Sequence, residues 1–262
     1  MICKTALSPS RLPGLDYALN PYFGCGHGCV YCYAPATLRY NGPEPWGSFV
    51  RAKSNVPCVL AKELHRKKRG VVGVSTVTDP YQPVEERLGL TRSCLEALLS
   101  KDFPVCIQTK SSLVLRDKDI LSRFSDIEVG FTVTTLDGRL SSVIEPGASP
   151  PGERLKALKA LSADGIKTWA FIGPMIPGVL DEERLRHLIY SLKETGVSYI
   201  MLDRLRLKPG IWVRMDRALK DECSILDACR SALFRNDGAF ERLRADAARI
   251  CGQLGLTCQF NF

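Results

Sequence analysis

Val71-Val-Gly-Val-Ser-Thr76 and Phe103-Pro-Val-Cys-Ile-Gln-Thr109 are two short runs rich in β-branched residues, and a helical pattern over residues 85–100 separates them. Strands of this length, joined by a helix of this length, are typical of a right-handed βαβ unit with parallel strands. The same alternation recurs on both sides of this unit. The recurrence predicts an α/β protein built on a parallel sheet.

Four further strand-like runs continue the alternation. They occupy residues 18–22, 127–133, 167–172 and 198–202, and helical patterns cover residues 56–69, 152–163 and 181–194. Six βα units fit this pattern rather than eight, which predicts a partial (β/α)6 barrel of the TIM type, open on one side. In such barrels the chemistry lies at the C-terminal ends of the strands, so the residues just after each run are the ones to inspect.

The alternation stops after about residue 205. Residues 221–233 and 239–254 have helical patterns, and the chain ends in an apolar, strand-like tail. The sequence therefore predicts a barrel over residues 1–205. Residues 206–262 are expected to form a helical C-terminal extension packed on the barrel.

The composition is that of an ordinary globular protein, with 45% hydrophobic and 24% charged residues. No run of about 18 apolar residues occurs, so the sequence predicts no membrane span. The first residues lack the apolar core of a signal peptide, and we expect a cytoplasmic protein. The net charge of +8 permits a nucleic-acid partner without requiring one.

The cysteines are the most informative residues. There are eleven, an odd number, and they cluster, which in a reducing compartment favours metal ligands and excludes a small secreted disulfide scaffold. Cys25-Gly-His-Gly-Cys29-Val-Tyr-Cys32 has the spacing C-x3-C-x2-C. Three thiolates this close together can bind one face of a cubane iron–sulfur cluster and leave one iron open. A zinc site needs a fourth ligand, and His27 lies between two cysteines, where it is poorly placed to complete a tetrahedron.

This motif is similar to that of the radical S-adenosylmethionine (SAM) superfamily. The resemblance implies that Cys25, Cys29 and Cys32 hold a [4Fe–4S] cluster whose open iron binds SAM. It also implies that the reduced cluster cleaves SAM to methionine and a 5′-deoxyadenosyl radical, which abstracts hydrogen from a substrate. The residue before the third cysteine is usually aromatic in that superfamily and packs near adenine, a role that falls on Tyr31 here.

Other short stretches between residues 20 and 201 resemble the spore photoproduct lyase-like branch of that superfamily. They are Asn20-Pro-Tyr22, Thr76-Val-Thr-Asp79, Thr109-Lys110, Phe131-Thr132, Glu145-Pro-Gly147 and Phe171-Ile-Gly-Pro-Met-Ile176.

In that lyase two hydroxyls and a lysine contact SAM, and the resemblance places these roles on Thr78, Lys110 and Thr132. A lysine offers a positive charge to the methionyl carboxylate, and hydroxyls can hydrogen-bond the ribose or the amino group. The plainer alternatives are a solvated lysine and two threonines that favour strands.

One departure separates this chain from the lyase. In the lyase pattern a cysteine that returns a hydrogen atom stands where this sequence has Thr76. A threonine O–H bond is too strong to donate hydrogen readily to a carbon radical, so the resemblance argues against thymine-dimer repair by the lyase mechanism. Cys106 is the candidate substitute as a catalytic residue. Strand alternation does not fix its direction, and a small buried residue is the alternative interpretation.

Three features near the barrel mouth and the C-terminus leave alternatives open. Asp79 follows the second predicted strand and either orients the cysteine loop or caps the helix near Glu85. Residues 203–220 carry six basic and two acidic residues with Trp212, which suits a phosphate backbone and a stacked base, a charged surface loop, or a peptide clamp. An auxiliary iron–sulfur cluster is the alternative to buried thiols for four C-terminal cysteines, Cys223, Cys229, Cys251 and Cys258.

The sequence thus predicts a radical SAM enzyme, with the choice between a lyase and a transferase left open. Its cofactors are a [4Fe–4S] cluster and SAM, and its electron donor is a reductant such as ferredoxin or flavodoxin. The substrate is a nucleic acid, a protein side chain or a small metabolite. The alternatives are a non-catalytic iron–sulfur or zinc module that binds nucleic acid, and a peptide-modifying radical SAM enzyme with an auxiliary cluster.

Overall fold

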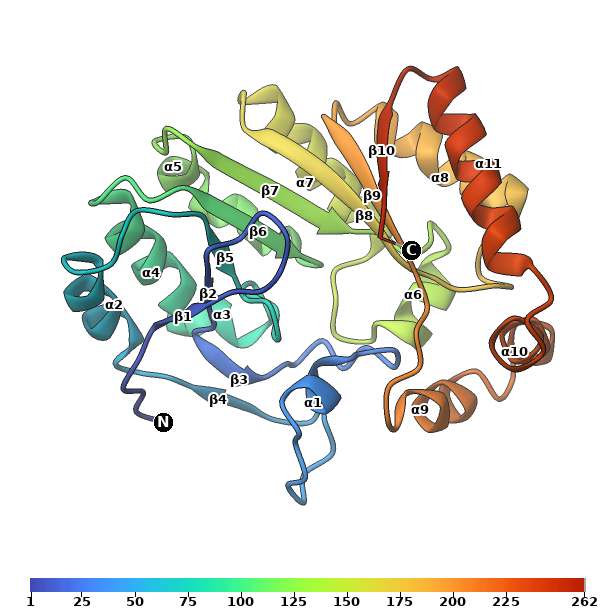
Figure 1. Cartoon of the computed structure of the whole chain (residues 1–262), viewed down its shortest axis with the longest axis horizontal. Helices are drawn as coiled ribbons and strands as arrows, with labels where there is room; N and C mark the ends of the chain where they lie inside the picture. The colour runs from blue at the N-terminus through green and yellow to red at the C-terminus, as the bar shows by residue number, and fades with distance from the viewer. Residues whose placement is uncertain (262) are drawn as a thin grey trace.

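The computed structural model describes residues 1–261, and eight strands form one curved sheet in the order β1-β2-β5-β6-β7-β8-β9-β10 (Figure 1). Neighbouring strands are parallel throughout, except that β1 runs antiparallel to β2. The strands are β1 (Leu7–Pro9), β2 (Tyr17–Leu19), β5 (Val72–Val74), β6 (Val105–Thr109), β7 (Ile127–Thr132), β8 (Lys167–Met175), β9 (Tyr199–Arg204) and β10 (Thr257–Phe260).

The six predicted strands are confirmed as β2 and β5 to β9. The edge strands β1 and β10 lie at opposite ends of the sheet, so the barrel is partial and open, as the sequence predicted. A second, two-stranded sheet pairs β3 (Tyr22–Gly24) with β4 (Val50–Ala52) in antiparallel fashion. The sequence did not predict this small sheet, which carries the segment that enters the cysteine motif.

The chain has helices along the outer side of the curved sheet and further helices near the cysteine motif, away from that side (Figure 1). They are α1 (Ala34–Thr37), α2 (Val56–Leu64), α3 (Val84–Leu88), α4 (Leu90–Leu99), α5 (Lys118–Leu121), α6 (Gly138–Ile144), α7 (Pro151–Ala163), α8 (Glu182–Lys193), α9 (Ile211–Ala218), α10 (Cys223–Arg230) and α11 (Ala239–Gln253), with a 3-10 helix η1 (Ser112–Asp117) and a π-helical turn η2 (Ser231–Arg235).

Two local features explain where the predicted helices begin and end. Asp181 caps α8, because its carboxylate accepts a hydrogen bond from the Arg184 amide at 2.8 Å. The helix predicted over residues 85–100 is instead two helices, since Gly89 adopts a left-handed conformation with φ of 60° between α3 and α4.

Strand alternation divides the sheet into an outer apolar face and an inner face. On β6 and β7, Val105, Ile107 and Val129 are buried in the main apolar core beneath the helices. Cys106 and Gln108 alternate with them and are only half-buried, because they point to the inner face that lines the barrel lumen. The lumen of this open barrel therefore holds polar side chains such as Gln108 together with the stacked rings of Trp169 and Tyr199.

The C-terminal extension adds a strand to the main sheet and packs against the cysteine motif. Its strand β10 pairs in parallel with β9 and so extends the main sheet. Residues 203–220, for which a surface loop was one interpretation, contain the helix α9. Helices α9 and α10 share a second apolar cluster with Cys29, Val30 and Tyr31 of the cysteine motif. No helix of the described chain is long and apolar enough to cross a membrane.

Candidate active site

The cysteine loop, residues 25–32, connects β3 to α1 and lies at the C-terminal ends of the main strands. Cys25 and Cys29 are buried and Cys32 is half-buried. The three thiols are close enough that each contributes to the electrostatic environment of another. Burial raises the pKa of Cys25 to about 12 and the pKa of Cys29 above its ordinary value, so both remain protonated until a metal displaces the protons.

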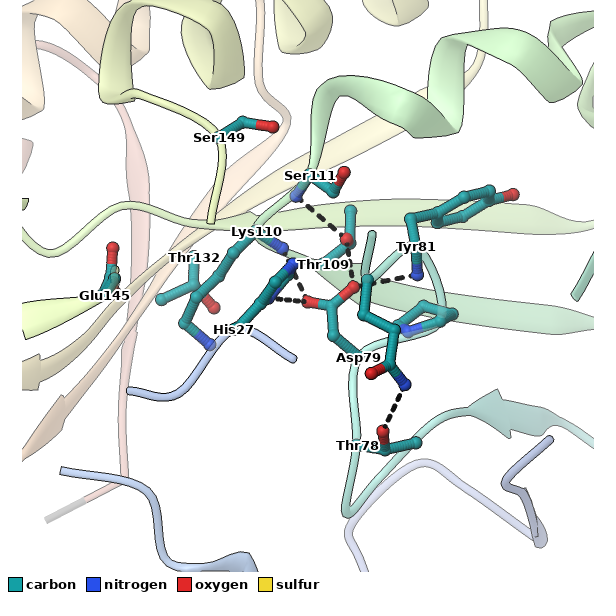
Figure 2. Close-up of polar contacts among 12 residues, drawn as sticks. His27, Thr78, Asp79, Tyr81, Thr109, Lys110, Ser111, Thr132, Glu145 and Ser149 are labelled. Atoms are coloured by element: carbon teal, nitrogen blue, oxygen red, sulfur yellow. Dashed lines mark hydrogen bonds and ion pairs between the residues drawn. The ribbon is translucent and has the colours of Figure 1, made fainter. Parts of the chain in front are cut away.

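Asp79 anchors the middle of this loop. Its buried carboxylate accepts hydrogen bonds from the Thr109 hydroxyl at 2.7 Å and from the amides of Tyr81 and Lys110 at 2.9 Å, and Nδ1 of His27 lies 3.3 Å from it (Figure 2). Burial would raise the pKa of Asp79, but His27, Lys110 and Thr109 outweigh it and hold the pKa well below its ordinary value. Of the two roles the sequence allowed, Asp79 therefore orients the cysteine loop, and α3 has no side-chain cap.

Thr78 and Gln82 hold the start of the same loop. The Thr78 hydroxyl donates to the Gly24 carbonyl at 2.6 Å and accepts from the Gln82 amide at 3.0 Å. The other end of the Gln82 side chain accepts from the Gly26 amide at 2.8 Å. The hydroxyl expected to contact SAM is thus already engaged with the loop backbone.

The segment after α6 holds the loop from the opposite side. The Gly147 amide donates to the His27 carbonyl at 2.9 Å, and the Val30 amide donates to the Ile144 carbonyl at 3.0 Å. A Cβ on Gly147 would lie 2.1 Å from the Gly26 carbonyl oxygen, so only glycine allows this approach. The resemblance to Glu145-Pro-Gly147 therefore marks a backbone contact with the cysteine loop.

Tyr31 is held by a buried ion pair. Its hydroxyl donates to Glu145, and Nη1 of Arg154 lies 2.6 Å from the other carboxylate oxygen of Glu145. Both charged side chains are 0% exposed. Arg154 also donates to the Ser149 and Thr132 carbonyls at 2.6 and 3.0 Å. The Tyr31 hydroxyl is already hydrogen-bonded in this network, so only the ring of Tyr31 is available to contact a ligand.

Lys110 follows β6 and points toward the cysteine loop. Its ammonium lies 5.9 Å from the centre of the Tyr31 ring, and it has no ion-pair partner among the described residues. Burial alone would lower the pKa of Lys110, but the negative charges of the Cys29 thiolate, when it forms, and of Glu145 and Asp79 raise it above its ordinary value. The site therefore contains a positively charged group beside the thiols that is not ion-paired in the described chain.

Thr132 and Cys106 line the barrel lumen. The Gln108 amide donates to the Thr132 hydroxyl at 3.0 Å, which places Gln108 and Thr132 on the same face. Cys106 precedes Gln108 by two residues and shares that face, deeper in the barrel. Burial and the charge of Glu128 raise the pKa of Cys106 to about 12, so it is a neutral thiol. The direction that the sequence left undecided for Cys106 is toward the lumen.

Comparison with known proteins identifies the family. Residues 19–190 match the description "Radical SAM superfamily". This chain belongs to the radical SAM superfamily. It is a radical SAM enzyme, and the membership implies SAM and an iron–sulfur cluster.

Two relatives and one solved structure are similar to this radical SAM enzyme. An uncharacterized protein of Methanocaldococcus jannaschii is 41% identical over 180 residues, which cover 69% of this chain and 68% of that protein. A protein of Pseudomonas phage M6 named radical SAM Nalpha-GlyT isomerase is 24% identical over 186 residues, covering 70% of this chain and 38% of that protein. A spore photoproduct lyase with bound AdoMet and dinucleoside spore photoproduct has a TM-score of 0.71 at 16% identity, covering 98% of this chain and 78% of the lyase.

These likenesses support the spore photoproduct lyase-like fold predicted from the sequence. The chain spans 68% of the length of the archaeal relative and 65% of that of an uncharacterized Mycobacterium tuberculosis relative.

The donor set of the cysteine loop suits an iron–sulfur cluster. Thiolates are the ligands that such clusters take from proteins, and each would bind a different iron, so they need not converge on one point. Among the described residues, no group of three or more His, Cys, Asp or Glu converges to hold a single metal ion. The fixed loop and its three thiols fit the cofactor that the radical SAM superfamily implies.

The four C-terminal cysteines lie in different environments. Cys223 is exposed, and Cys229 is buried in the second apolar cluster with its thiol 3.1 Å from the Pro177 carbonyl. Cys251 is buried in the main core, and Cys258 packs against the same core with its thiol in hydrogen-bond contact with that of Cys251. The structure therefore does not bring these four thiols together in the described chain.

The roles of four residues at this site were not predicted from the sequence. Arg154 is one of them. A sequence pattern could have indicated it, because this charged residue stands at a core-facing position of α7, three residues after buried Pro151 and three before buried Ala157. No sequence pattern indicates the roles of Gln82 and Gln108. Arg214, on α9, donates to the Val30 and Cys32 carbonyls at 3.1 and 2.7 Å, a contact that no local pattern indicates because about 180 residues separate the partners.

Proposed function

We propose that Cys25, Cys29 and Cys32 hold a [4Fe–4S] cluster and that the chain uses it to cleave SAM reductively. Contacts from two segments support this proposal, because residues 78–82 hold His27, Gly26 and the Gly24 carbonyl, and Ile144 at the end of α6 holds Val30. A loop fixed in this way presents its three thiols without a large ordering cost. When bound and reduced, the cluster supplies the electron that splits SAM into methionine and a 5′-deoxyadenosyl radical.

The observation that carries the proposal is the unpaired Lys110 ammonium beside Cys29 and the Tyr31 ring. A methionyl carboxylate next to the open iron needs a cationic partner, and Lys110 supplies one that stays protonated. The Thr132 hydroxyl accepts from Gln108 and retains a proton to donate to the ribose or amino group. The Tyr31 ring offers a flat face for adenine.

In this assignment Thr78 acts through the loop. Its hydroxyl already donates to the Gly24 carbonyl, so its remaining lone pair is what it can offer to SAM. Thr78 is therefore proposed as a residue that positions the cysteine loop and contacts SAM only as a hydrogen-bond acceptor.

The substrate is proposed to be a nucleic acid. The net charge of +8 and the basic residues that begin at the C-terminal end of β9 support this class, as does a fold shared with a lyase whose structure holds a dinucleoside. Cys106 is the proposed hydrogen donor in the lumen, because it is a protonated thiol on the inner face. We place the enzyme in a reducing cytoplasm with ferredoxin or flavodoxin as electron donor.

Anaerobic reconstitution tests the proposal. We expect about four iron atoms per chain and formation of 5′-deoxyadenosine from SAM after reduction with dithionite. Cys29→Ala should lose the iron and the formation of 5′-deoxyadenosine. Cys58→Ala, which removes an exposed thiol of α2, should keep the iron and the activity. A zinc-bound chain, or a full iron complement without SAM cleavage, would overturn the proposal.

A further inference from the structure

A pocket of about 450 Å³ opens beside the cysteine loop, between the loop that follows α1 and the start of α9. Figure 1 shows α1, its following loop and α9 at the same edge of the molecule. We call it the loop–α9 pocket and define it by Arg39, Tyr40, Glu44, Trp46, Pro209 and Arg214. It is separate from the lumen, because its walls come from outside the main sheet.

Aromatic rings form one wall of the loop–α9 pocket. The centroids of Tyr40 and Trp46 are 5.6 Å apart, and both rings pack against Phe23 and Phe49 of the small sheet region. All four rings are only half-buried. Ring-to-ring packing therefore fixes the orientation of Tyr40 and Trp46 while leaving part of their surface open to a ligand.

The charge of the pocket is positive. Its single carboxylate, Glu44, is paired with Arg51, which stacks over Phe49. Arg39 is exposed, and its guanidinium has no hydrogen-bond or ion-pair partner among the described residues. Arg214 is half-buried and already oriented by the carbonyls of the cysteine loop. Two guanidinium groups thus face a pocket whose own acid is neutralised.

We propose that the loop–α9 pocket binds one nucleotide of a nucleic-acid strand, next to the nucleotide on which the enzyme acts. This inference rests on the proposed function for its substrate class. Stacking on an aromatic ring combined with guanidinium contacts to phosphate is the pattern by which proteins hold single-stranded nucleic acid. Arg214 touches both the pocket and the Cys32 carbonyl, so a strand held there passes the mouth of the active site.

A binding experiment tests this inference separately from catalysis. Fluorescence anisotropy of a labelled oligothymidylate is measured on the reconstituted enzyme without SAM. We expect Trp46→Ala to weaken binding about tenfold, and Trp46→Phe, which keeps a ring, to restore most of it. Arg39→Gln should weaken binding and reduce the slope of log affinity against log salt by about 0.7.

Arg123→Gln is the matched control. Arg123 is also exposed and unpaired in the described chain, but it precedes β7 and so lies at the opposite end of the barrel. It should leave affinity and salt slope unchanged. Polyglutamate of equal charge should fail to displace the oligonucleotide, because it has phosphate-like charge but no base.

The outcomes separate this inference from the proposed function. If Trp46→Ala and Arg39→Gln bind like the wild type, or if polyglutamate or a neutral peptide competes equally, the nucleotide assignment is overturned. If the enzyme cleaves SAM but binds no oligonucleotide, the pocket proposal fails and the proposed cofactor chemistry stands. If both variants weaken binding in an enzyme that does not cleave SAM, the pocket assignment is supported and the proposed function fails.

Discussion

Nδ1 of His27 lies 3.3 Å from Oδ2 of Asp79, and both side chains are buried. The pair links the middle of the cysteine loop to the loop that follows β5, and the same carboxylate binds the end of β6 through Thr109 and the Lys110 amide. Lys110 is the residue with which the proposed site contacts the SAM carboxylate. One buried carboxylate therefore sets the position of the loop relative to the cationic group.

Removal of the Asp79 carboxylate is expected to destabilise the chain. Asp79→Ala leaves three buried donors and His27 without their acceptor, and we expect the free energy of unfolding to fall by about 3–5 kcal/mol. Urea unfolding in reducing buffer measures this change. Asp221→Ala removes an exposed carboxylate and should change the free energy of unfolding by less than about 0.5 kcal/mol.

The lowered pKa of Asp79 adds a pH dependence with a defined sign. A carboxyl whose folded pKa is depressed stabilises the protein above its unfolded pKa, and this contribution is lost as the pH falls toward the folded value. The difference in unfolding free energy between the wild type and Asp79→Asn should therefore shrink as the pH falls from about 4 toward 2. If the difference in unfolding free energy stays constant over this pH range, the ionised Asp79 carboxylate does not make the stabilising contacts described above.

The Glu145–Arg154 pair is expected to behave as a coupled unit. Both side chains are fully buried, so Arg154→Met should leave an unpaired buried charge and lower the unfolding free energy by about 3–5 kcal/mol. The double variant Glu145→Gln/Arg154→Met should cost less than the sum of the single variants by more than about 1 kcal/mol. Additive costs in the same urea series would show that the two residues do not act together.

Lys110 is predicted to set the affinity for SAM. Lys110→Gln removes the only proposed cationic partner of the methionyl carboxylate, and we expect the SAM concentration for half-maximal cleavage to rise at least tenfold. The iron content should stay at the wild-type value, because Lys110 is not a ligand. Lys101→Gln, which changes an exposed lysine just before β6, serves as the control. An unchanged SAM dependence in Lys110→Gln would remove Lys110 from the SAM site.

The sheet was predictable because its strands are local patterns. Each predicted run from residue 103 onward carries buried, β-branched residues on its outer face, and the intervening helices show an apolar stripe. The small sheet was not predictable, because β3 and β4 have only three residues each and pair over a long loop. The helix α9 was not predicted because its segment is rich in charged residues, although Ile211 and Met215 form its buried face.

The site was predictable in its parts but not in its connections. The spacing of the cysteines identified the loop, and the resemblance predicted SAM contacts for Lys110 and Thr132, which stay predictions. Side chains that act by contact with distant backbone, such as Gln82, Arg154 and Arg214, follow no local pattern. Likewise, alternation showed that Cys106 and Gln108 share a face, but only the pairing of β6 with β7 showed that this face is the lumen.

Cys106 is expected to react slowly despite its partial exposure. Its pKa is raised to about 12 by burial and by Glu128, so very little thiolate is present near neutral pH. Iodoacetamide at pH 7.5, followed by mass spectrometry, should label the exposed Cys58 and Cys223 well before Cys106. Labelling of Cys106 should become fast only after unfolding. A Cys106 that reacts as fast as Cys58 would contradict its proposed role as a protonated hydrogen donor.

Arg214 is predicted to hold the third cysteine of the loop from the C-terminal extension. Its guanidinium donates to the Val30 and Cys32 carbonyls, so Arg214→Met leaves two partly buried acceptors unpaired. We expect this variant to retain iron about tenfold less tightly and to show a changed electron paramagnetic resonance spectrum of the reduced cluster. Arg214→Lys should recover part of both, because one donor returns. Arg217→Gln, three residues along α9 and exposed, should match the wild type. If Arg214→Met retains iron as tightly as the wild type and gives the same spectrum, the C-terminal extension covers the cysteine loop but does not position it.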